Sequence, residues 1–152
     1  MIYENAMEVV FDSRSINEGF ARVAVAAFLA QLNPTLEEVS DVKTAVSEAV
    51  TNAIIHGYEQ EINSIWIRCK YEGNCFYIEV EDWGKGIPDI SKAMEPLFTS
   101  KPELERSGMG FSFMEAFMDE VQVESIPNRK GTLVRMQKII GKGRELWSTQ
   151  SL

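Results

Sequence analysis

The sequence predicts an α+β fold, a two-layer sandwich in which helices cover one face of a mixed, mostly antiparallel sheet. Several runs alternate apolar and polar residues, which is the period-two pattern of strands with one buried face. Two other segments repeat apolar residues every three or four positions and stop at proline or glycine, as amphipathic helices do. Because the strands pair antiparallel and the helices lie apart from them, two packed layers are expected.

The chain has the size and composition of one globular domain. It contains 152 residues, of which 45% are hydrophobic and 25% are charged, as in chains that fold around their own core. We expect one domain over residues 1–140 and a frayed tail over 141–152. The longest apolar run, Val23 to Ala30, is too short to span a bilayer, and the first ten residues lack the basic region of a signal peptide. A soluble, cytoplasmic protein without membrane contact is therefore expected.

The charge balance argues against direct binding of nucleic acid. Asp and Glu number 23 against 15 Lys and Arg, which gives a net charge of −8, and the basic residues are scattered along the chain. Cys69, Cys75 and a single histidine are too few for a disulfide framework or for a four-ligand zinc site. An acidic surface would favour the approach of a basic protein partner.

Two capping signals mark the starts of the predicted helices. Ser15 with Glu18 three positions later predicts a helix that continues to Gln31, and Thr35 with Glu38 predicts a longer helix that continues to His56. The first helix has apolar residues on more than one face, so it is either buried on two sides or keeps one side for a partner.

The strands are predicted from alternation and turn residues. A turn at Glu72-Gly73 would place Cys69 opposite Phe76 and would put Cys75 on the other face of the hairpin. Further along the chain, the pattern predicts a strand before the first helix, a short helix after a loop-rich stretch and two more strands, at Ala6–Phe11, 108–117, Val121–Ile126 and Thr132–Ile140.

Four short motifs carry the residues suited to chemistry. Glu48, Asn52 and His56 follow one another at steps of four, so they lie on one stripe of the second helix. Taken alone, this stripe is more typical of a solvated polar face. The segment from Asp82 to Ile87 follows a strand, and its two glycines let the backbone approach something flat or bulky. Taken alone, this motif is more typical of a plain Asp-x-Gly turn.

The other two motifs contain glycines at element starts. Ser107-Gly108-Met109-Gly110 opens a helix, where free backbone N–H groups can bind an anion, and Lys101 and Arg106 lie just upstream. Gly131-Thr132 places a turn glycine and a hydroxyl at the start of a strand. Each motif alone is weak evidence of function.

In this order, the four motifs resemble the GHKL (Bergerat-fold) ATPase and kinase superfamily, over about residues 35–140. The longer runs 46–58 and 96–110, together with 13–31, are similar to the anti-sigma-factor serine kinases of endospore-forming bacteria. This resemblance covers nearly the whole chain up to about residue 140. It implies the Bergerat ATP-binding fold, with ATP and Mg²⁺ as cofactors.

The resemblance implies a role for each matching residue in nucleotide binding. Asp82 would accept a hydrogen bond from the adenine amine, with Thr132 in support, and Gly84 and Gly86 would let the backbone pass the purine. Asn52 would be the protein ligand of Mg²⁺, since its amide oxygen is a hard donor.

The same resemblance implies how the phosphates are held and transferred. Glu48 would be the general base, and Arg106 would offset charge that develops during transfer. Binding of the triphosphate would fall to a set of loop and helix-start residues, namely Thr99, Lys101, Gly108, Met109 and Gly110.

The resemblance also implies partners. These are a sigma factor of the sigma-F type, an anti-anti-sigma protein that is phosphorylated on a serine, and a second copy of the chain in a homodimer. Arg22 would contact a partner, although an ion pair with Glu18 on the same helix accounts for it equally well. Three alternatives remain: a nucleotide-gated sigma-binding protein with incidental catalysis, a detached histidine-kinase domain, and a stress-response kinase of the same class.

Overall fold

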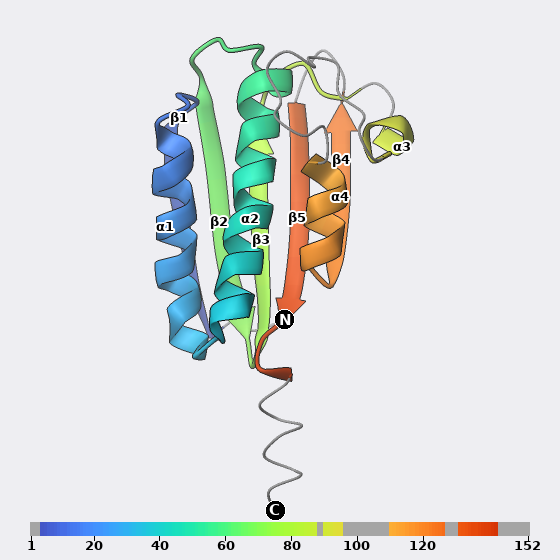
Figure 1. The fold of residues 1–152 in the computed structure, drawn as a ribbon. Coiled ribbons are helices and arrows are strands. Elements are labelled where there is room, and N and C mark those ends of the chain that lie inside the picture. The colour runs from blue at the N-terminus through green and yellow to red at the C-terminus, as the bar shows by residue number, and fades with distance from the viewer. Residues whose placement is uncertain (1–3, 88–89, 96–109, 127–130, 143–152) are drawn as a thin grey trace, which may run out of the picture.

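The computed structural model describes residues 4–87, 90–95, 110–126 and 131–142, and five strands among them form one sheet (Figure 1). The strand order is β1-β2-β3-β5-β4, and every pairing is antiparallel, so the prediction of a mixed sheet is wrong in this respect. The strands are β1 (Asn5–Asp12), β2 (Ser64–Glu72), β3 (Cys75–Asp82), β4 (Glu120–Ile126) and β5 (Gly131–Ile139).

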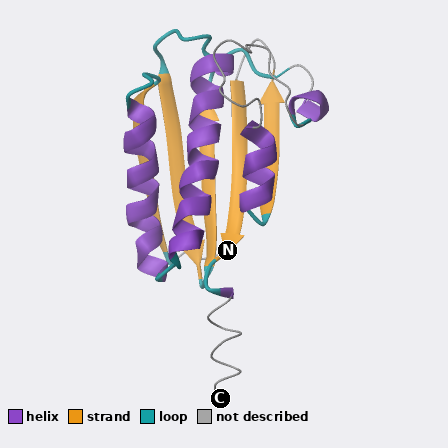
Figure 2. Ribbon diagram, in the orientation of Figure 1, coloured by secondary structure: helices purple, strands orange, loops and turns teal. Residues whose placement is uncertain are grey.

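The helices form a second layer over one face of the sheet, as the sequence predicts (Figure 2). α2 lies between α1 and α4 and packs against both. The helical segments are α1 (Asn17–Leu29), η1 (Ala30–Leu32), α2 (Leu36–Asn52), η2 (Ala53–Gly57), α3 (Ile90–Ala93) and α4 (Gly110–Phe117). In the described ranges, no helix has the length and apolar character that crossing a membrane requires.

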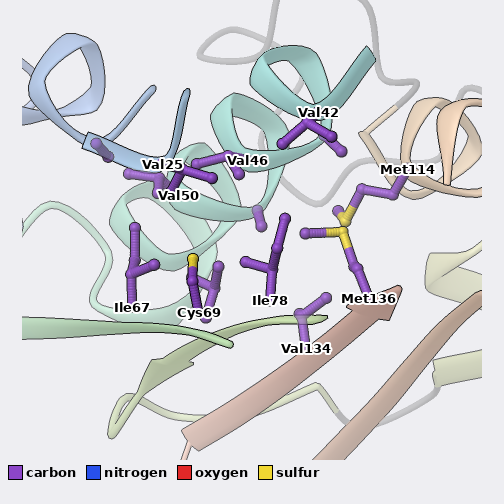
Figure 3. Close-up of a cluster of buried hydrophobic side chains, with 14 of the residues drawn as sticks. Val25, Val42, Val46, Val50, Ile67, Cys69, Ile78, Met114, Val134 and Met136 are labelled. Atoms are coloured by element: carbon purple, nitrogen blue, oxygen red, sulfur yellow. The ribbon is translucent and has the colours of Figure 1, made fainter. Parts of the chain in front are cut away.

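The core lies between the two layers (Figure 3). Val46 and Val50 of α2 face Ile67 and Ile78 of the sheet, and all four side chains are fully buried. The alternation of buried and less buried residues along β2 and β3 confirms that the hairpin has one buried face. Cys69 lies on that face and Cys75 on the other, and both are free thiols.

The hairpin register differs from the prediction by two residues. The turn is Gly73-Asn74, and Cys69 therefore lies opposite Ile78 rather than Phe76. Gly73 has φ +57°, a conformation that glycine adopts readily. A shift of two preserves the face on which each side chain lies, because side chains alternate with period two.

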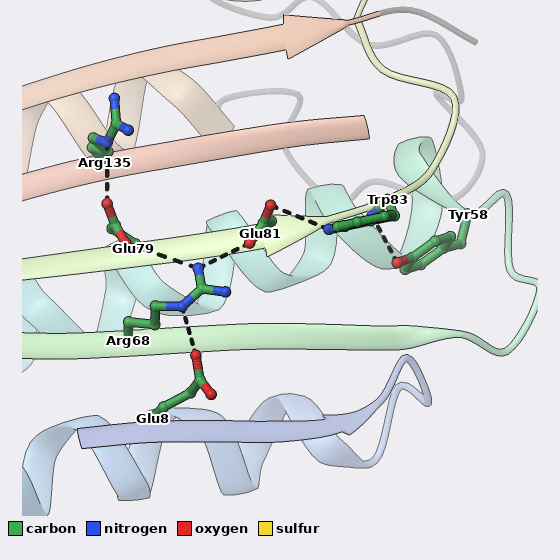
Figure 4. Close-up of polar contacts among 7 residues, drawn as sticks. All are labelled: Glu8, Tyr58, Arg68, Glu79, Glu81, Trp83 and Arg135. Carbon is green, nitrogen blue, oxygen red and sulfur yellow. Dashed lines mark hydrogen bonds and ion pairs between the residues drawn. The ribbon is translucent and has the colours of Figure 1, made fainter. Parts of the chain in front are cut away.

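The opposite face of the sheet carries a ladder of charges (Figure 4). Arg68 of β2 pairs with Glu8 of β1 at 2.6 Å and with Glu81 of β3 at 2.9 Å, and Arg135 of β5 pairs with Glu79 of β3 at 3.1 Å. Opposite charges across neighbouring strands stabilise pairing modestly, so the ladder supports the sheet without covering this face.

Of the two predicted capping boxes, only the second is present. Thr35 accepts a hydrogen bond from the Glu38 backbone at 3.1 Å, and Glu38 Oε1 accepts one from the Thr35 backbone at 2.9 Å. The prediction of a capping box at Ser15 and Glu18 is wrong, because α1 begins after Ile16 without a side-chain cap. Glu18 instead accepts a hydrogen bond from Ser47 of α2, which joins the two helices.

Glu38 also ties the end of the sheet to the helix layer. Its second oxygen, Oε2, accepts a hydrogen bond of 2.8 Å from the backbone N–H of Gly141, just beyond β5. The Glu38 carboxylate therefore accepts from the Thr35 N–H at the start of α2 and from the Gly141 N–H, which lies 103 residues after Glu38.

We expect Glu38→Ala to lower the free energy of unfolding by about 1–2 kcal/mol, because two backbone donors lose a charged acceptor. The neighbouring Glu37 is exposed in the same first turn. Glu37→Ala should therefore change the stability by no more than about 0.5 kcal/mol, through the helix dipole alone. Urea unfolding followed by circular dichroism measures both, and equal effects would contradict the double role of Glu38.

Candidate functional site

A buried carboxylate lies where β3 ends. The Asp82 side chain is only 5% exposed, and its Oδ1 accepts a hydrogen bond of 2.9 Å from the backbone N–H of Gly84. Burial raises the pKa of Asp82 from 3.8 to about 6, while hydrogen bonds from the Gly84 and Thr132 backbones act in the opposite direction. A buried acceptor of this kind is suited to a ligand that brings a hydrogen-bond donor.

Close backbone contacts fix this carboxylate between the sheet and the helix layer. A Cβ atom on Gly84 would lie 2.0 Å from the carbonyl oxygen of Gly57, and a Cβ on Gly57 would lie 2.7 Å from Asp82 Oδ1. On the other side, Gly131 has φ +72°, and a Cβ there would lie 2.1 Å from the Asp82 carbonyl oxygen. Glycine is therefore required at Gly84 and Gly131, where a Cβ would meet backbone atoms, and a Cβ at Gly57 would displace the Asp82 carboxylate.

Gly57 and Ser125 are parts of this site that the sequence interpretation missed. Sequence reasoning gives Gly57 no role beyond ending the helix that continues to His56. In the structure Gly57 is the last residue of the π-helical turn η2 and lies against the Asp82 carboxylate. Ser125 of β4 accepts a 2.6 Å hydrogen bond from the Ile87 backbone, and its Oγ lies 3.3 Å from the Thr132 hydroxyl. A single serine in a strand gives no sequence signal, because only the pairing of β4 with β5 places it beside Thr132.

Two hydrogen bonds of the Tyr58 hydroxyl hold the start of the loop that follows Asp82. Its hydroxyl donates to the Ser64 carbonyl at 2.6 Å and accepts from the Trp83 backbone N–H at 2.8 Å (Figure 4). Burial is the largest influence on this phenol and raises its pKa. The tyrosine thus joins the end of η2, the start of β2 and the end of β3.

A second group of polar residues meets at the start of α4. Glu48 and Asn52 lie one turn apart on α2, as predicted, and Gly110 is the first residue of α4. A Cβ on Gly110 would lie 3.2 Å from Asn52 Nδ2 and 3.4 Å from Glu48 Oε2, so the backbone of α4 touches both side chains. The free N–H groups of the first helical turn favour an anion at this point.

The Asn52 side chain gives a reason to expect a ligand beside the start of α4. Its Nδ2 atom is buried and has no hydrogen-bond partner among the described residues. An unpaired buried amide is unfavourable unless a ligand supplies the acceptor. A phosphate oxygen could accept from Nδ2, while the amide oxygen Oδ1 is a hard donor for Mg²⁺. The residues present therefore fit a magnesium-bound polyphosphate.

The remaining predicted residues are distributed as follows. Gly86 has φ +78° and lies in the loop between Asp82 and Ile87, where a glycine conformation is needed. The other phosphate-loop predictions lie outside the described residues, and they are Thr99, Lys101, Arg106, Gly108 and Met109.

Arg22 belongs to a different surface, on α1. Its Nε lies 3.0 Å from Glu18 Oε1, an ion pair at i, i+4 that lacks hydrogen-bond geometry. The predicted ion pair is thus present. Three large apolar side chains of the same region are exposed, at 83%, 51% and 63% for Ile16, Phe20 and Val23.

Comparisons with known proteins show the family to which the chain belongs. The family described as "Histidine kinase-like ATPase domain" matches residues 12–138. An anti-sigma F factor of Thermoanaerobacter sp. (strain X514) is 62% identical over 144 residues, which cover 95% of this chain and all of that protein. One of Geobacillus kaustophilus (strain HTA426) is 58% identical over 93% of this chain and 97% of that protein.

Two solved structures share the fold. The RsbU and RsbW domains of Rv1364c from Mycobacterium tuberculosis match with a TM-score of 0.62 and 18% identity, over 90% of this chain and 32% of that one. The histidine kinase domain of Erythrobacter litoralis EL346 matches with a TM-score of 0.55 and 17% identity, over 85% and 64%. The chain therefore belongs to the histidine kinase-like ATPase domain family and, within it, to the anti-sigma F factors.

The raised pKa of Asp82 predicts a pH dependence of stability. Between pH 3.8 and about 6 the folded protein keeps a proton that the unfolded chain has lost, so stability falls as pH rises through this window. At about 1.4 kcal/mol per pKa unit, the loss amounts to at most about 3 kcal/mol. Asp82→Asn should remove this component. Urea unfolding of both proteins from pH 3.5 to 7 measures it, and parallel stability curves would contradict the shift.

Proposed function

We propose that this chain binds Mg²⁺ and ATP, holds a sigma factor of the sigma-F type while ATP is bound, and phosphorylates a serine of an anti-anti-sigma protein. It would act in the cytoplasm, where RNA polymerase is found. The observation that carries the nucleotide-binding part of the proposal is that one helical run, α2 with η2, contacts both groups of residues. Its Glu48 and Asn52 meet Gly110 of α4, and its last residue, Gly57, lies against Asp82. The identity to proteins named anti-sigma F factor supports the partner.

In this proposal the adenine amine donates to the Asp82 carboxylate. The Ser125 hydroxyl holds the backbones of Ile87 and Gly131 and lies beside the Thr132 hydroxyl, and Gly84 and Gly86 would leave room for the flat ring. Binding favours the ionised carboxylate, because the amine donates to the charged acceptor.

Glu48 would act as general base, within reach of the phosphate end of the nucleotide. It accepts the proton of the substrate serine while that oxygen bonds to the γ-phosphorus, and the bond to the bridging oxygen of ADP breaks. Mg²⁺, when bound by Asn52 and the phosphate oxygens, supplies positive charge against the triphosphate. Lys101 and Arg106, with Thr99, Gly108 and Met109, would complete the phosphate loop.

The partner surface would be the exposed side of α1. Phe20 and Val23 present apolar area beside the guanidinium of Arg22, whose side chain is 42% exposed. Exposed apolar residues around an arginine are typical of protein interfaces. We also propose that the chain forms a homodimer, whose interface would lie near this exposed side of α1.

We expect Glu48→Gln to lower the rate of phosphoryl transfer from ATP to the anti-anti-sigma protein by about 10² to 10⁴. Transfer is followed with radiolabelled ATP, and acid-stable phosphate on the substrate distinguishes serine from histidine. The variant should still bind ADP and the sigma factor, as isothermal titration calorimetry would show. Unchanged transfer would overturn the base assignment, and loss of ADP binding in Asp82→Asn would separately support the adenine contact.

We expect Arg22→Ala to weaken binding of the sigma factor at least about tenfold, since arginines often dominate interface energies. Its effect on unfolding should stay below about 0.5 kcal/mol, because the ion pair with Glu18 is an i, i+4 surface pair. Arg14→Ala is the matched control, since Arg14 is more exposed and pairs with Asp12 at 3.8 Å. Equal effects of the two substitutions on sigma binding would count against this surface.

A further inference from the structure

A groove of about 600 Å³ lies next to the candidate nucleotide site but outside it. Asp82 and Trp83 are consecutive at the end of β3, so their side chains leave the strand on opposite faces. Asp82 is buried toward the helices, whereas Trp83 is 58% exposed. The groove surrounds this tryptophan, and its lining includes Glu59, Glu61, Trp66 and Lys85.

Two indole rings form the apolar wall of the groove. The ring centroids of Trp66 and Trp83 are 6.0 Å apart, and the Trp83 indole N–H donates to Glu81 at 3.2 Å, which fixes the plane of the exposed ring. Val10, which pairs with Trp66 across the β1–β2 ladder, is 51% exposed and continues the apolar surface. An exposed cluster of this kind is typical of a recognition surface.

The turn that contributes Glu59 to the groove has an unusual backbone. Glu59 and Gln60 follow one another with φ values of +51° and +70°. This left-handed conformation favours glycine and asparagine, and two consecutive long side chains are unexpected there. Strained positions of this sort often occur where a side chain has a function. Here the turn contributes Glu59 to the groove lining, with its carboxylate 3.7 Å from the ammonium group of Lys85.

The charges of the lining favour a cation. Glu59 and Glu61 contribute two carboxylates, whereas Lys85 contributes one ammonium group, 3.7 Å from Glu59. A guanidinium can stack on an indole face and pair with a carboxylate at the same time, which a lysine ammonium does less well. The net charge of −8 on the whole chain also favours a basic ligand.

We propose that this groove binds an arginine-bearing segment of a partner protein, with the guanidinium over the Trp83 ring and beside Glu61. The apolar neighbours of that arginine would lie on Trp66 and Val10. This inference does not rest on the proposed kinase activity, since no residue assigned to catalysis lines the groove. Gly57 and Gly84 line both places, so the segment would lie directly behind the adenine-binding backbone.

The test uses the full chain and a capped peptide with one arginine between two leucines, compared with the same peptide carrying citrulline. Nuclear magnetic resonance follows the indole N–H signals, which Trp66→Phe and Trp83→Phe assign. We expect saturable shifts of both signals with the arginine peptide, and binding about tenfold weaker with citrulline. Equal binding of the two peptides, or no shift at either indole, would overturn the proposal.

Variants test the charge and ring contributions separately. We expect Trp83→Ala to weaken the arginine peptide about tenfold and Glu61→Gln about threefold, whereas Lys85→Met should strengthen binding about threefold by removing a like charge. Glu37→Gln, an exposed acid on α2, should change nothing. If Trp83→Ala fails to fold, Lys85→Met and the citrulline peptide decide the question.

Two further results would also overturn the proposal. In the first, Trp83→Ala changes the sedimentation coefficient of the chain without peptide, which would make the groove an interface between copies. In the second, Lys85→Met weakens the arginine peptide, which would exclude a cation beside the carboxylates. Binding of ADP, measured in the same variants, reports on the proposed function independently.

Discussion

The structure depends on the contact between two glycine backbones, at Gly57 and Gly84. Their approach leaves no space for a Cβ atom, and the turn that contains Gly84 donates from the Lys85 N–H to the Gly57 carbonyl at 2.9 Å. Without this contact the end of the helix layer could not close over Asp82. The carboxylate would then be solvated, and it would lose the selectivity that a dry acceptor gives toward a donor on a ligand.

Burial of Asp82 is unfavourable by itself, and its surroundings offset the penalty only in part. Two backbone N–H groups donate to the carboxylate, yet its pKa remains above the ordinary value. Burial of the Asn52 side chain is also unfavourable, because its amide Nδ2 atom has no hydrogen-bond partner among the described residues. Both groups therefore lower the stability of the folded chain, a cost that proteins commonly carry where binding depends on preorganised polar groups, and this agrees with the nucleotide site that we propose.

Local patterns predicted the elements well, but they did not predict every contact at the ends. Thr35 and Glu38 form their capping box because both partners are close in sequence, and because Gly141 binds the second oxygen of Glu38 and leaves Oε1 to the Thr35 N–H. Ser15 and Glu18 have the same spacing, yet Glu18 is taken by Ser47 and Arg22 after the helices pack. In the β2–β3 hairpin, the alternation of apolar residues determined the buried face. The turn residues did not determine the register, which differs from the prediction by two residues.

The sequence by itself determined which side chains share a helix face or a sheet face, because these follow from the periods of the helix and the strand. It therefore placed Glu48 with Asn52, and Asp82 at a strand end. Only the tertiary structure brought Gly110 to Glu48 and Asn52, and Gly57 to Asp82, since each pair comes from elements distant in the chain. It likewise placed Ser125 beside Thr132 and Ile87. The same holds for the Trp66–Trp83 groove, whose lining comes from two segments, 57–66 and 83–85, that meet only in the folded chain.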